Sequence, residues 1–158
     1  MTDTNNPREH AWDMMEKTHS CVLITHDGEA IRARPMSPNV DRNENAIYFL
    51  TAKGSEKEQE IEEIQSVSIS FQSGNDFVVV AGDARLTNDR AKIAELFGPF
   101  AKAWFEGPDD PRIRLITVTP YEAEYWDTPG TIATSASMLA AAVTGGRPKV
   151  GENRKTSM

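Results

Sequence analysis

The chain has 158 residues, 26% of them charged, and its formal charge at pH 7 is −7. This length suits one domain that can bury a hydrophobic core of its own. The excess of acidic residues argues against a general binder of nucleic acid or of anionic membranes, because both ligands require positively charged protein surfaces. A single cysteine, Cys21, excludes disulfide bonds within the chain and zinc sites built from several cysteines.

The two ends of the chain are polar. Residues 1–8 lack the apolar centre of a signal peptide, and no stretch of the sequence reaches the length of a membrane span. We therefore expect a cytoplasmic protein without a membrane partner. Residues 145–158 contain four basic residues, one acidic residue and two adjacent glycines. We predict one domain over residues 1–144, followed by a disordered polar tail over residues 145–158.

A helix and a β-hairpin are the first predicted elements. Apolar side chains recur at helical spacing after Pro7, which predicts an amphipathic helix over residues 7–18. The β-rich run of residues 21–25 then leads through Asp27-Gly28, a strong hairpin signal, into a strand over residues 32–36.

Arg32 and Arg34 stand two residues apart on this strand. Successive side chains of a strand point to opposite faces, so the two guanidinium groups share one face and favour an anion. A second strand, over residues 46–51, leads to Ser55. Glu58 follows three residues later and completes a capping-box pattern, which predicts the start of a helix.

The start of this helix is the strongest candidate for a binding site. Free backbone N–H groups and the positive end of the helix dipole favour anions there, and Lys57 adds a positive charge in the first turn. With Thr51 at the end of the strand and Ser55 at the cap, the segment predicts a phosphate site. The alternative interpretation is structural: Ser55 only caps the helix, Lys57 is solvated, and the arginines belong to an exposed sheet.

Two more strands follow the helix. Residues 66–71 alternate between polar and apolar, and a Gly-Asn turn leads into the apolar run of residues 76–82. We expect Gly82 to mark a β-bulge or a close approach of another backbone. The later predicted elements are, in chain order, a helix through residue 97, a short helix over 101–105, a strand over 112–118 that ends before Pro120, an extended segment over 123–126 and a helix over 134–143.

Two side-chain predictions concern the core and metals. Trp104 and Phe105 are expected to pack in the hydrophobic core. The three histidines show no metal-ligand spacing with carboxylates, so no metal site is predicted.

Taken together, several segments resemble the FMN site of pyridoxamine 5′-phosphate oxidase-like split-barrel proteins. The similar segments are Arg-x-Arg-Pro-Met over residues 32–36, Phe-Leu-Thr over 49–51, Gly-Ser-x-Lys over 54–57, the strand of residues 78–86 and Ala-Glu-Tyr-Trp-Asp over 123–127. The general stress protein branch is the most similar, because residues 103–111 and 118–120 resemble its signatures. The resemblance covers about residues 8–145.

This resemblance implies a mainly β (α+β) fold, an antiparallel split β-barrel with peripheral helices. Strands joined by hairpins, without alternating β-α-β units, favour the same architecture. The resemblance also implies a homodimer that binds FMN at its interface, with FAD as the alternative, and a small-molecule electron donor or acceptor.

The resemblance implies cofactor-binding roles for ten residues, while the catalytic residues stay unknown. The phosphate is assigned to Arg32, Ser55 and Lys57, the ribityl chain and ring to Leu50 and Thr51, the pyrimidine edge to Arg34, Pro35 and Met36, an apolar ring contact to Phe77, and a contact with the partner subunit's flavin to Trp126.

Two departures from the oxidases bear on activity. Glu56 stands where they carry an arginine that adds to phosphate binding, and Asp127-Thr128-Pro129-Gly130 follows Trp126 where they carry Arg-x-His. Vitamin B6 oxidase activity is therefore not expected. Two functions stay open: an FMN-dependent oxidoreductase linked to the stress response, and a non-catalytic protein that sequesters or senses flavin. The deazaflavin F420 and haem are less favoured on this barrel, because the chain lacks an extended basic groove and its histidines fall near element ends.

Overall fold

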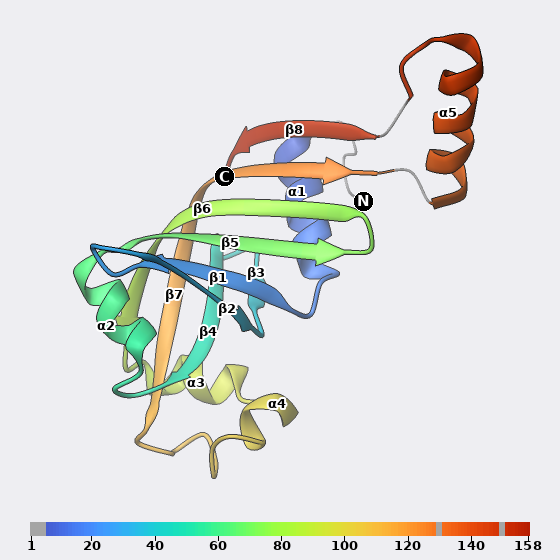
Figure 1. Cartoon of the computed structure of the whole chain (residues 1–158). Helices are drawn as coiled ribbons and strands as arrows, with labels where there is room; N and C mark the ends of the chain where they lie inside the picture. Colours follow the sequence, from blue (N-terminus) through green and yellow to red (C-terminus); the bar gives the residue numbers. More distant parts are fainter. Residues whose placement is uncertain (1–5, 129–130, 149–150) are drawn as a thin grey trace.

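The computed structural model describes residues 6–128, 131–148 and 151–158. Figure 1 shows its helices and strands, which are, in chain order, α1 (Pro7–Glu16), β1 (Cys21–His26), β2 (Ile31–Met36), β3 (Asn39–Asp41), β4 (Ala46–Ala52), α2 (Glu56–Glu63), β5 (Ser66–Ser73), β6 (Asp76–Thr87), α3 (Arg90–Leu96), α4 (Pro99–Lys102), β7 (Ile113–Asp127), α5 (Thr131–Thr144) and β8 (Glu152–Ser157).

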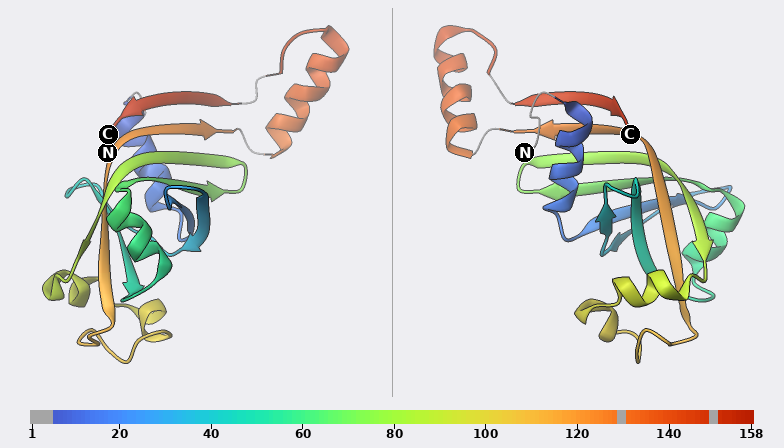
Figure 2. Two further views of the ribbon diagram at one scale, coloured as in Figure 1. Left: turned by 60° about the vertical axis from the view of Figure 1, so that its left-hand side comes forward. Right: turned by 180° about the vertical axis from the view of Figure 1, so that it is seen from behind.

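The strands form one antiparallel sheet in the order β2-β1-β5-β6-β7-β4-β3, and β8 pairs with β7 beside this path. Strand β7 pairs with β4 along residues 113–118 and with β8 along residues 122–127, while β6 runs beside both parts. The sheet bends along β7 and curls, with helices at its periphery (Figures 1 and 2). The predicted fold class, a mainly β (α+β) antiparallel split β-barrel with peripheral helices, is confirmed.

The hydrophobic core lies between the curled sheet and α1. Strand β4 contributes Ile47 and Phe49 to it, and its alternate side chains join a second cluster that packs against α3. Burial on both faces explains why β4 is apolar from Ala46 to Leu50. Helix α1 covers the main core with three fully buried side chains, those of Ala11, Trp12 and Met15. The predicted amphipathic helix is therefore confirmed.

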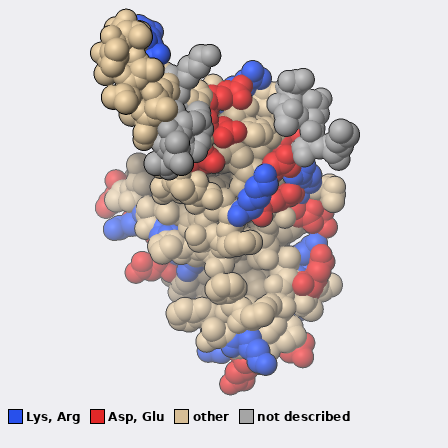
Figure 3. Space-filling view, turned by 90° about the vertical axis from the view of Figure 1, so that its right-hand side faces the viewer, with Lys and Arg blue, Asp and Glu red and all other residues tan. Residues whose placement is uncertain are grey.

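Two exposed apolar regions lie outside these clusters. Helix α5 projects away from the sheet (Figures 1 and 2), and Figure 3 shows the projection as largely uncharged surface. Trp104, in the turn after α4, is 79% exposed, so the prediction that it packs in the core is wrong. Phe105 packs against the second core cluster, as predicted.

The first hairpin forms as predicted and positions both arginines of β2. Asp27 accepts hydrogen bonds from the backbone N–H groups of Ala30 (2.7 Å) and Glu29 (2.9 Å). These bonds are the main reason why the pKa of its carboxyl falls to about 2. Gly28 has a φ of +93°, which glycine adopts without steric cost.

Strand β7 runs through Pro120, so the prediction that the strand ends before this proline is wrong. Pro120 lies opposite Gly82, where the register of β6 against β7 shifts after Ala81. A proline lacks the N–H group that a regular ladder position needs, and an irregularity in the ladder accommodates this loss.

The C-terminal residues form a strand, so the prediction of a disordered tail over residues 145–158 is wrong for Glu152–Ser157. Strand β8 pairs with the end of β7, and Lys155 Nζ lies 2.9 Å from a carboxylate oxygen of Glu122 across the pair. Met158 packs against the main core. Strand pairing uses backbone N–H and C=O groups, which polar residues also carry. A polar composition therefore does not show that a segment is disordered.

Replacing Gly82 with alanine is expected to destabilise the fold by about 1–2 kcal/mol. A Cβ atom at Gly82 would lie 2.7 Å from the Thr119 carbonyl oxygen and 2.8 Å from Val118 Cγ1. The expectation of a bulge or a close backbone approach is thus confirmed. Urea unfolding measures the effect, with Gly107→Ala as the control, because a Cβ atom at Gly107 meets nothing within 4 Å. Equal unfolding midpoints for the two variants would contradict the prediction.

Candidate functional site

The predicted phosphate site lies where β4 leads into α2. Thr51 is buried at the end of β4, and Ser55 is the N-cap of α2 in an extended conformation. The Ser55 side chain makes no capping hydrogen bond; its Oγ lies 3.4 Å from Thr51 Oγ1. Glu58 accepts a hydrogen bond from the backbone N–H of Gly54. The predicted helix start is confirmed, but the Ser55 hydroxyl faces Thr51 and not the helix backbone.

The first turn of α2 presents backbone donors beside this hydroxyl pair. The N–H groups of Glu58 and Gln59 donate to the Ser55 carbonyl oxygen. Those of Glu56 and Lys57 have no acceptor in the described part of the chain. Unpaired N–H groups are normal at the start of a helix, where they bind anions.

Lys57 is half-buried next to Arg34. Burial is the largest influence that lowers the pKa of the Lys57 ammonium group, and the positive charge of Arg34 lowers it further. The carboxylates of Glu60 and Glu56 oppose this shift without cancelling it. Across the residues that the structure describes, no carboxylate forms an ion pair with Lys57. Lys57 is thus a cation without an ion-pair partner in the described part of the chain, and an anion would neutralise it.

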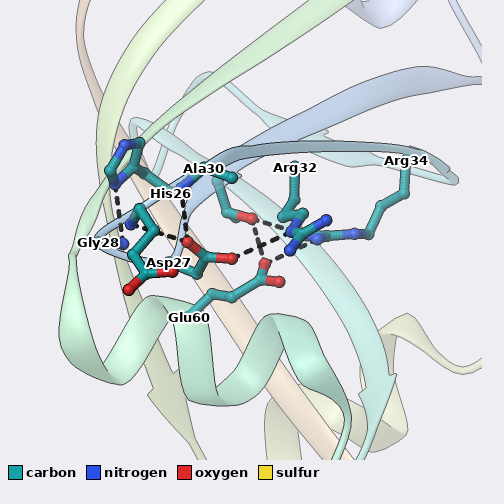
Figure 4. A network of polar contacts seen from close by, with 9 residues as sticks. His26, Asp27, Gly28, Ala30, Arg32, Arg34 and Glu60 are labelled. Atoms are coloured by element: carbon teal, nitrogen blue, oxygen red, sulfur yellow. Dashed lines mark hydrogen bonds and ion pairs between the residues drawn. The ribbon is translucent and has the colours of Figure 1, made fainter.

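Arg32 and Arg34 share one face of β2, as predicted, and both point toward α2 (Figure 4). Arg34 donates hydrogen bonds to Thr25 Oγ1 (2.9 Å) and to a carboxylate oxygen of Glu60 (2.7 Å). Arg32 donates from Nε to Asp27 (3.1 Å). Each arginine thus has an acidic partner, which the sequence analysis missed.

Glu60 is the buried member of this network. Burial raises the pKa of its carboxyl, but hydrogen bonds from Thr25 and Arg34 together outweigh burial, so the pKa lies below the ordinary glutamate value. Glu60 is therefore ionised at neutral pH and neutralises part of the charge of Arg34. Lys57 is left as the cation without a paired carboxylate.

An acidic groove of about 420 Å³ lies between the β1–β2 turn and α2. Five carboxylates, one arginine and one amide line it: Asp27, Glu29, Arg32, Glu56, Gln59, Glu60 and Glu63. Like charges disfavour a phosphate dianion in such a groove. Arg32 lies in this groove, whereas the positive charge of Arg34 acts on Lys57, so we expect Arg34 rather than Arg32 on the phosphate side.

Phe77 and Trp126 form a cross-strand pair far from the phosphate site. They lie directly opposite each other on β6 and β7, and they are 36% and 37% exposed. Their end of the sheet is opposite to the end that carries α2 (Figure 1). A single chain therefore does not bring these two aromatic residues to Lys57.

The other three predicted cofactor residues differ in their surroundings. Pro35 is exposed on β2, whereas Met36 packs against the main core. Leu50 packs against the second cluster, which α3 covers. Met36 and Leu50 thus have structural contacts, and a flavin contact for any of the three stays a prediction.

A histidine–carboxylate pair lies where α1 meets the end of β7. His10 Nε2 is 2.7 Å from a carboxylate oxygen of Asp127, and the imidazole ring packs edge-on against Tyr125 at 4.9 Å. A pocket of about 180 Å³ adjoins the pair. No local sequence pattern indicates this pair, because 117 positions separate the two residues.

Residues 6–128, 131–148 and 151–158 contain no cluster of three or more His, Cys, Asp or Glu side chains that could hold a metal ion. None of their helices combines the length and the hydropathy needed to span a bilayer.

Two curated relatives match part of the chain. The protein bli-3 of Neurospora crassa is 28% identical over 113 residues, which cover 65% of this chain and 54% of the relative. General stress protein 26 of Bacillus subtilis is 30% identical over 79 residues, covering 47% of this chain and 56% of the relative. The chain therefore spans about half the length of these relatives.

Solved structures match a larger share of this chain. A protein assigned as general stress protein 26 from Jannaschia sp. CCS1 is 27% identical with a TM-score of 0.76, and the match covers 94% of this chain and 96% of that one. The general stress FMN/FAD binding protein of Xanthomonas citri is 25% identical with a TM-score of 0.68, covering 78% and 89% of the two chains.

The model of the family described as pyridoxamine 5′-phosphate oxidase like matches residues 6–149, which is nearly the whole chain. The resemblance inferred from the sequence motifs and the split-barrel topology agree with this match. The chain belongs to the pyridoxamine 5′-phosphate oxidase-like family, and within it is similar to general stress protein 26.

Proposed function

We propose that the chain is an FMN-binding flavoprotein that transfers electrons between a small-molecule donor and acceptor in the cytoplasm. The observation that carries this proposal is the half-buried Lys57, which lacks a carboxylate partner and lies beside Arg34 at the start of α2. The name of the Xanthomonas citri relative, a general stress FMN/FAD binding protein, supports the choice of ligand.

The donors around Lys57 suit a phosphate monoester. The hydroxyl pair of Thr51 and Ser55 and the N–H groups of Glu56 and Lys57 supply hydrogen-bond donors on one side of the site. In the ligand-free protein, burial first and the charge of Arg34 second lower the pKa of Lys57. A dianion would reduce the repulsion between Lys57 and Arg34. When bound, the flavin ring would supply the electron-transfer chemistry, and these residues would hold its phosphate.

The separation of the predicted site residues favours a homodimer. Phe77 and Trp126 lie at the end of the sheet opposite to Lys57, so one chain offers two halves of a site. A two-fold axis repeats each half on both subunits and can bring the aromatic pair of one copy to the phosphate site of the other. In this proposal the flavin lies at the interface.

An absorbance spectrum of the protein purified without added cofactor tests the proposal directly. We expect flavin bands, and mass spectrometry of the molecule released by heat should identify FMN. If the protein is purified without ligand, titration with FMN and with FAD should show binding, with the stronger affinity for FMN. A colourless protein that binds neither flavin would contradict the proposal.

A non-catalytic flavin protein is the second candidate. His10 and Asp127 bond to each other, and Glu60 bonds to Thr25 and Arg34, so none of these three side chains is a free general base. Oxidation of NADH or NADPH in the presence of quinones and nitro compounds separates the two functions: turnover supports the oxidoreductase, and FMN binding without turnover supports sequestration or sensing.

A further inference from the structure

A closed ring of hydrogen bonds holds the guanidinium group of Arg34. Arg34 Nη1 donates to Thr25 Oγ1 (2.9 Å), and Arg34 Nη2 donates to Glu60 Oε2 (2.7 Å). The Thr25 hydroxyl donates in turn to the same Glu60 oxygen and closes the ring. Three elements contribute to it, because Thr25 belongs to β1, Arg34 to β2 and Glu60 to α2. Figure 4 shows Arg34 and Glu60 pointing toward each other.

The ring is shielded from solvent. Thr25 and Glu60 are buried, and Arg34 is largely buried. Water therefore has little access to these bonds, and a hydrogen bond between ionised groups is stronger than one between neutral groups. A guanidinium group is planar, so acceptors on both terminal nitrogens fix its plane. A single acceptor would leave the group free to turn.

The ring leaves part of Arg34 available for a ligand. It uses two N–H groups of the guanidinium, which carries five. The remaining N–H groups have no acceptor in the described part of the chain. Lys57 and Glu60 stand three residues apart on α2, so they lie on one side of this helix. Arg34, which is bonded to Glu60, therefore approaches α2 on the side that carries Lys57.

We propose that Thr25 and Glu60 are positioning residues for phosphate binding: they hold the Arg34 guanidinium in one orientation, with its remaining N–H groups toward the phosphate. The inference rests on the FMN-binding function proposed above and adds two residues to the phosphate site. Both residues act through Arg34 and do not touch the ligand. An arginine that is already immobilised loses less conformational freedom on binding, so the ring strengthens binding without adding a contact.

The hydroxyl of Thr25 offers a clean way to open the ring. Valine has nearly the same shape as threonine and also favours strands, so Thr25→Val suits its place in β1. The variant changes no charge, and the ion pair of Arg34 and Glu60 stays in place. It removes only one of the two anchors of the guanidinium.

Titration with FMN and with riboflavin, which has the same ring system and no phosphate, tests the inference. The ratio of the two dissociation constants measures the contribution of the phosphate. We expect Thr25→Val to lower this ratio about three- to tenfold by weakening FMN binding alone, and Thr25→Ser, which keeps the hydroxyl, to preserve it. Thr25→Cys provides a second variant with the effect of valine, because a thiol is a weak acceptor. Thr18→Val is the control, since it removes another buried hydroxyl, which donates to the Met14 carbonyl oxygen.

NMR of the arginine side-chain nitrogens tests the ring in the ligand-free protein. The two terminal nitrogens of Arg34 should give separate signals in the unchanged chain and in Thr25→Ser, and one averaged signal in Thr25→Val. Averaged signals in the unchanged chain would overturn the inference. So would a ratio that Thr25→Val leaves unchanged, or one that Thr25→Ser or Thr18→Val lowers equally. In these last cases FMN still binds and the flavin proposal stands, whereas a chain that binds neither flavin contradicts both.

Discussion

Replacing Arg34 with methionine is expected to destabilise the fold by about 3–5 kcal/mol at pH 7. The side chains of Arg34 and Glu60 are only 21% and 8% exposed, and their N–O distance is 2.7 Å. Without the guanidinium, the Glu60 carboxylate stays buried and keeps only the hydroxyl of Thr25 as a donor. The cost arises from this unpaired charge and not from the loss of Arg34 packing alone.

Arg32→Met is the matched control for this prediction. It lies on the same face of the same strand, but its ion pair with Asp27 is more exposed, so its loss should change stability far less. The double variant Arg34→Met, Glu60→Leu should recover most of the lost stability, because no charge is left buried. Urea unfolding of the three variants provides the measurement. Equal destabilisation by Arg34→Met and Arg32→Met would contradict the assignment.

The pH dependence of the same experiment has a definite sign. The pKa of Glu60 is lowered in the folded protein, so its ion pair adds stability above the unfolded-state pKa, and this stability is lost as the pH falls through the folded-state pKa. Arg34→Met should therefore cost most at pH 7, and its cost should shrink as the pH falls below the ordinary glutamate value. A cost that does not change with pH would show that packing, and not charge, is responsible.

Local sequence signals could predict much of the fold. The Asp27-Gly28 turn and the Ser55 helix start depend on bonds between residues at most four positions apart, such as that from the N–H of Ala30 to Asp27. The apolar period of α1 also predicted the buried side of that helix correctly. These features need no knowledge of the tertiary structure, because each is complete within one short segment.

Pairing between distant segments could not be predicted. Arg42, in the turn after β3, contacts three carboxylates of α1, and these partners lie 26 to 33 positions away: Glu9, Asp13 and Glu16. The hydrogen bonds to Glu16 and Asp13 raise the pKa of Arg42 above its usual range. Composition shows only that such charges exist, and the tertiary fold decides which of them meet.

The same limit applies to the candidate site. The motif correctly indicated that Thr51 and Ser55 lie close together, because a strand end and a helix start are joined by one short turn. It could not distinguish Arg32 from Arg34, since both share the face that points to α2. Their acidic partners come from the hairpin turn and from α2, and these partners make the two arginines different.

Replacing Lys57 with methionine is expected to weaken FMN binding by about 1.5–3 kcal/mol, or roughly 10- to 150-fold in Kd. Lys57 supplies the only cation of the site that has no carboxylate partner among the described residues, and methionine keeps most of the apolar stem that packs there. Fluorescence titration with FMN measures the affinity. Lys53→Met is the control, because Lys53 lies four positions earlier and is exposed.

The stability of the ligand-free variant separates a binding role from a structural one. The pKa of Lys57 is lowered in the folded protein, so its charged form costs stability at all pH values below that pKa. Lys57→Met should therefore leave the Tm of the ligand-free protein unchanged or slightly higher. Saturating FMN should raise the Tm of the unchanged chain and of Lys53→Met, because a ligand stabilises the state that binds it, and should raise that of Lys57→Met much less. A variant that loses Tm without ligand, yet binds FMN normally, would show that Lys57 supports the fold and that the phosphate binds elsewhere.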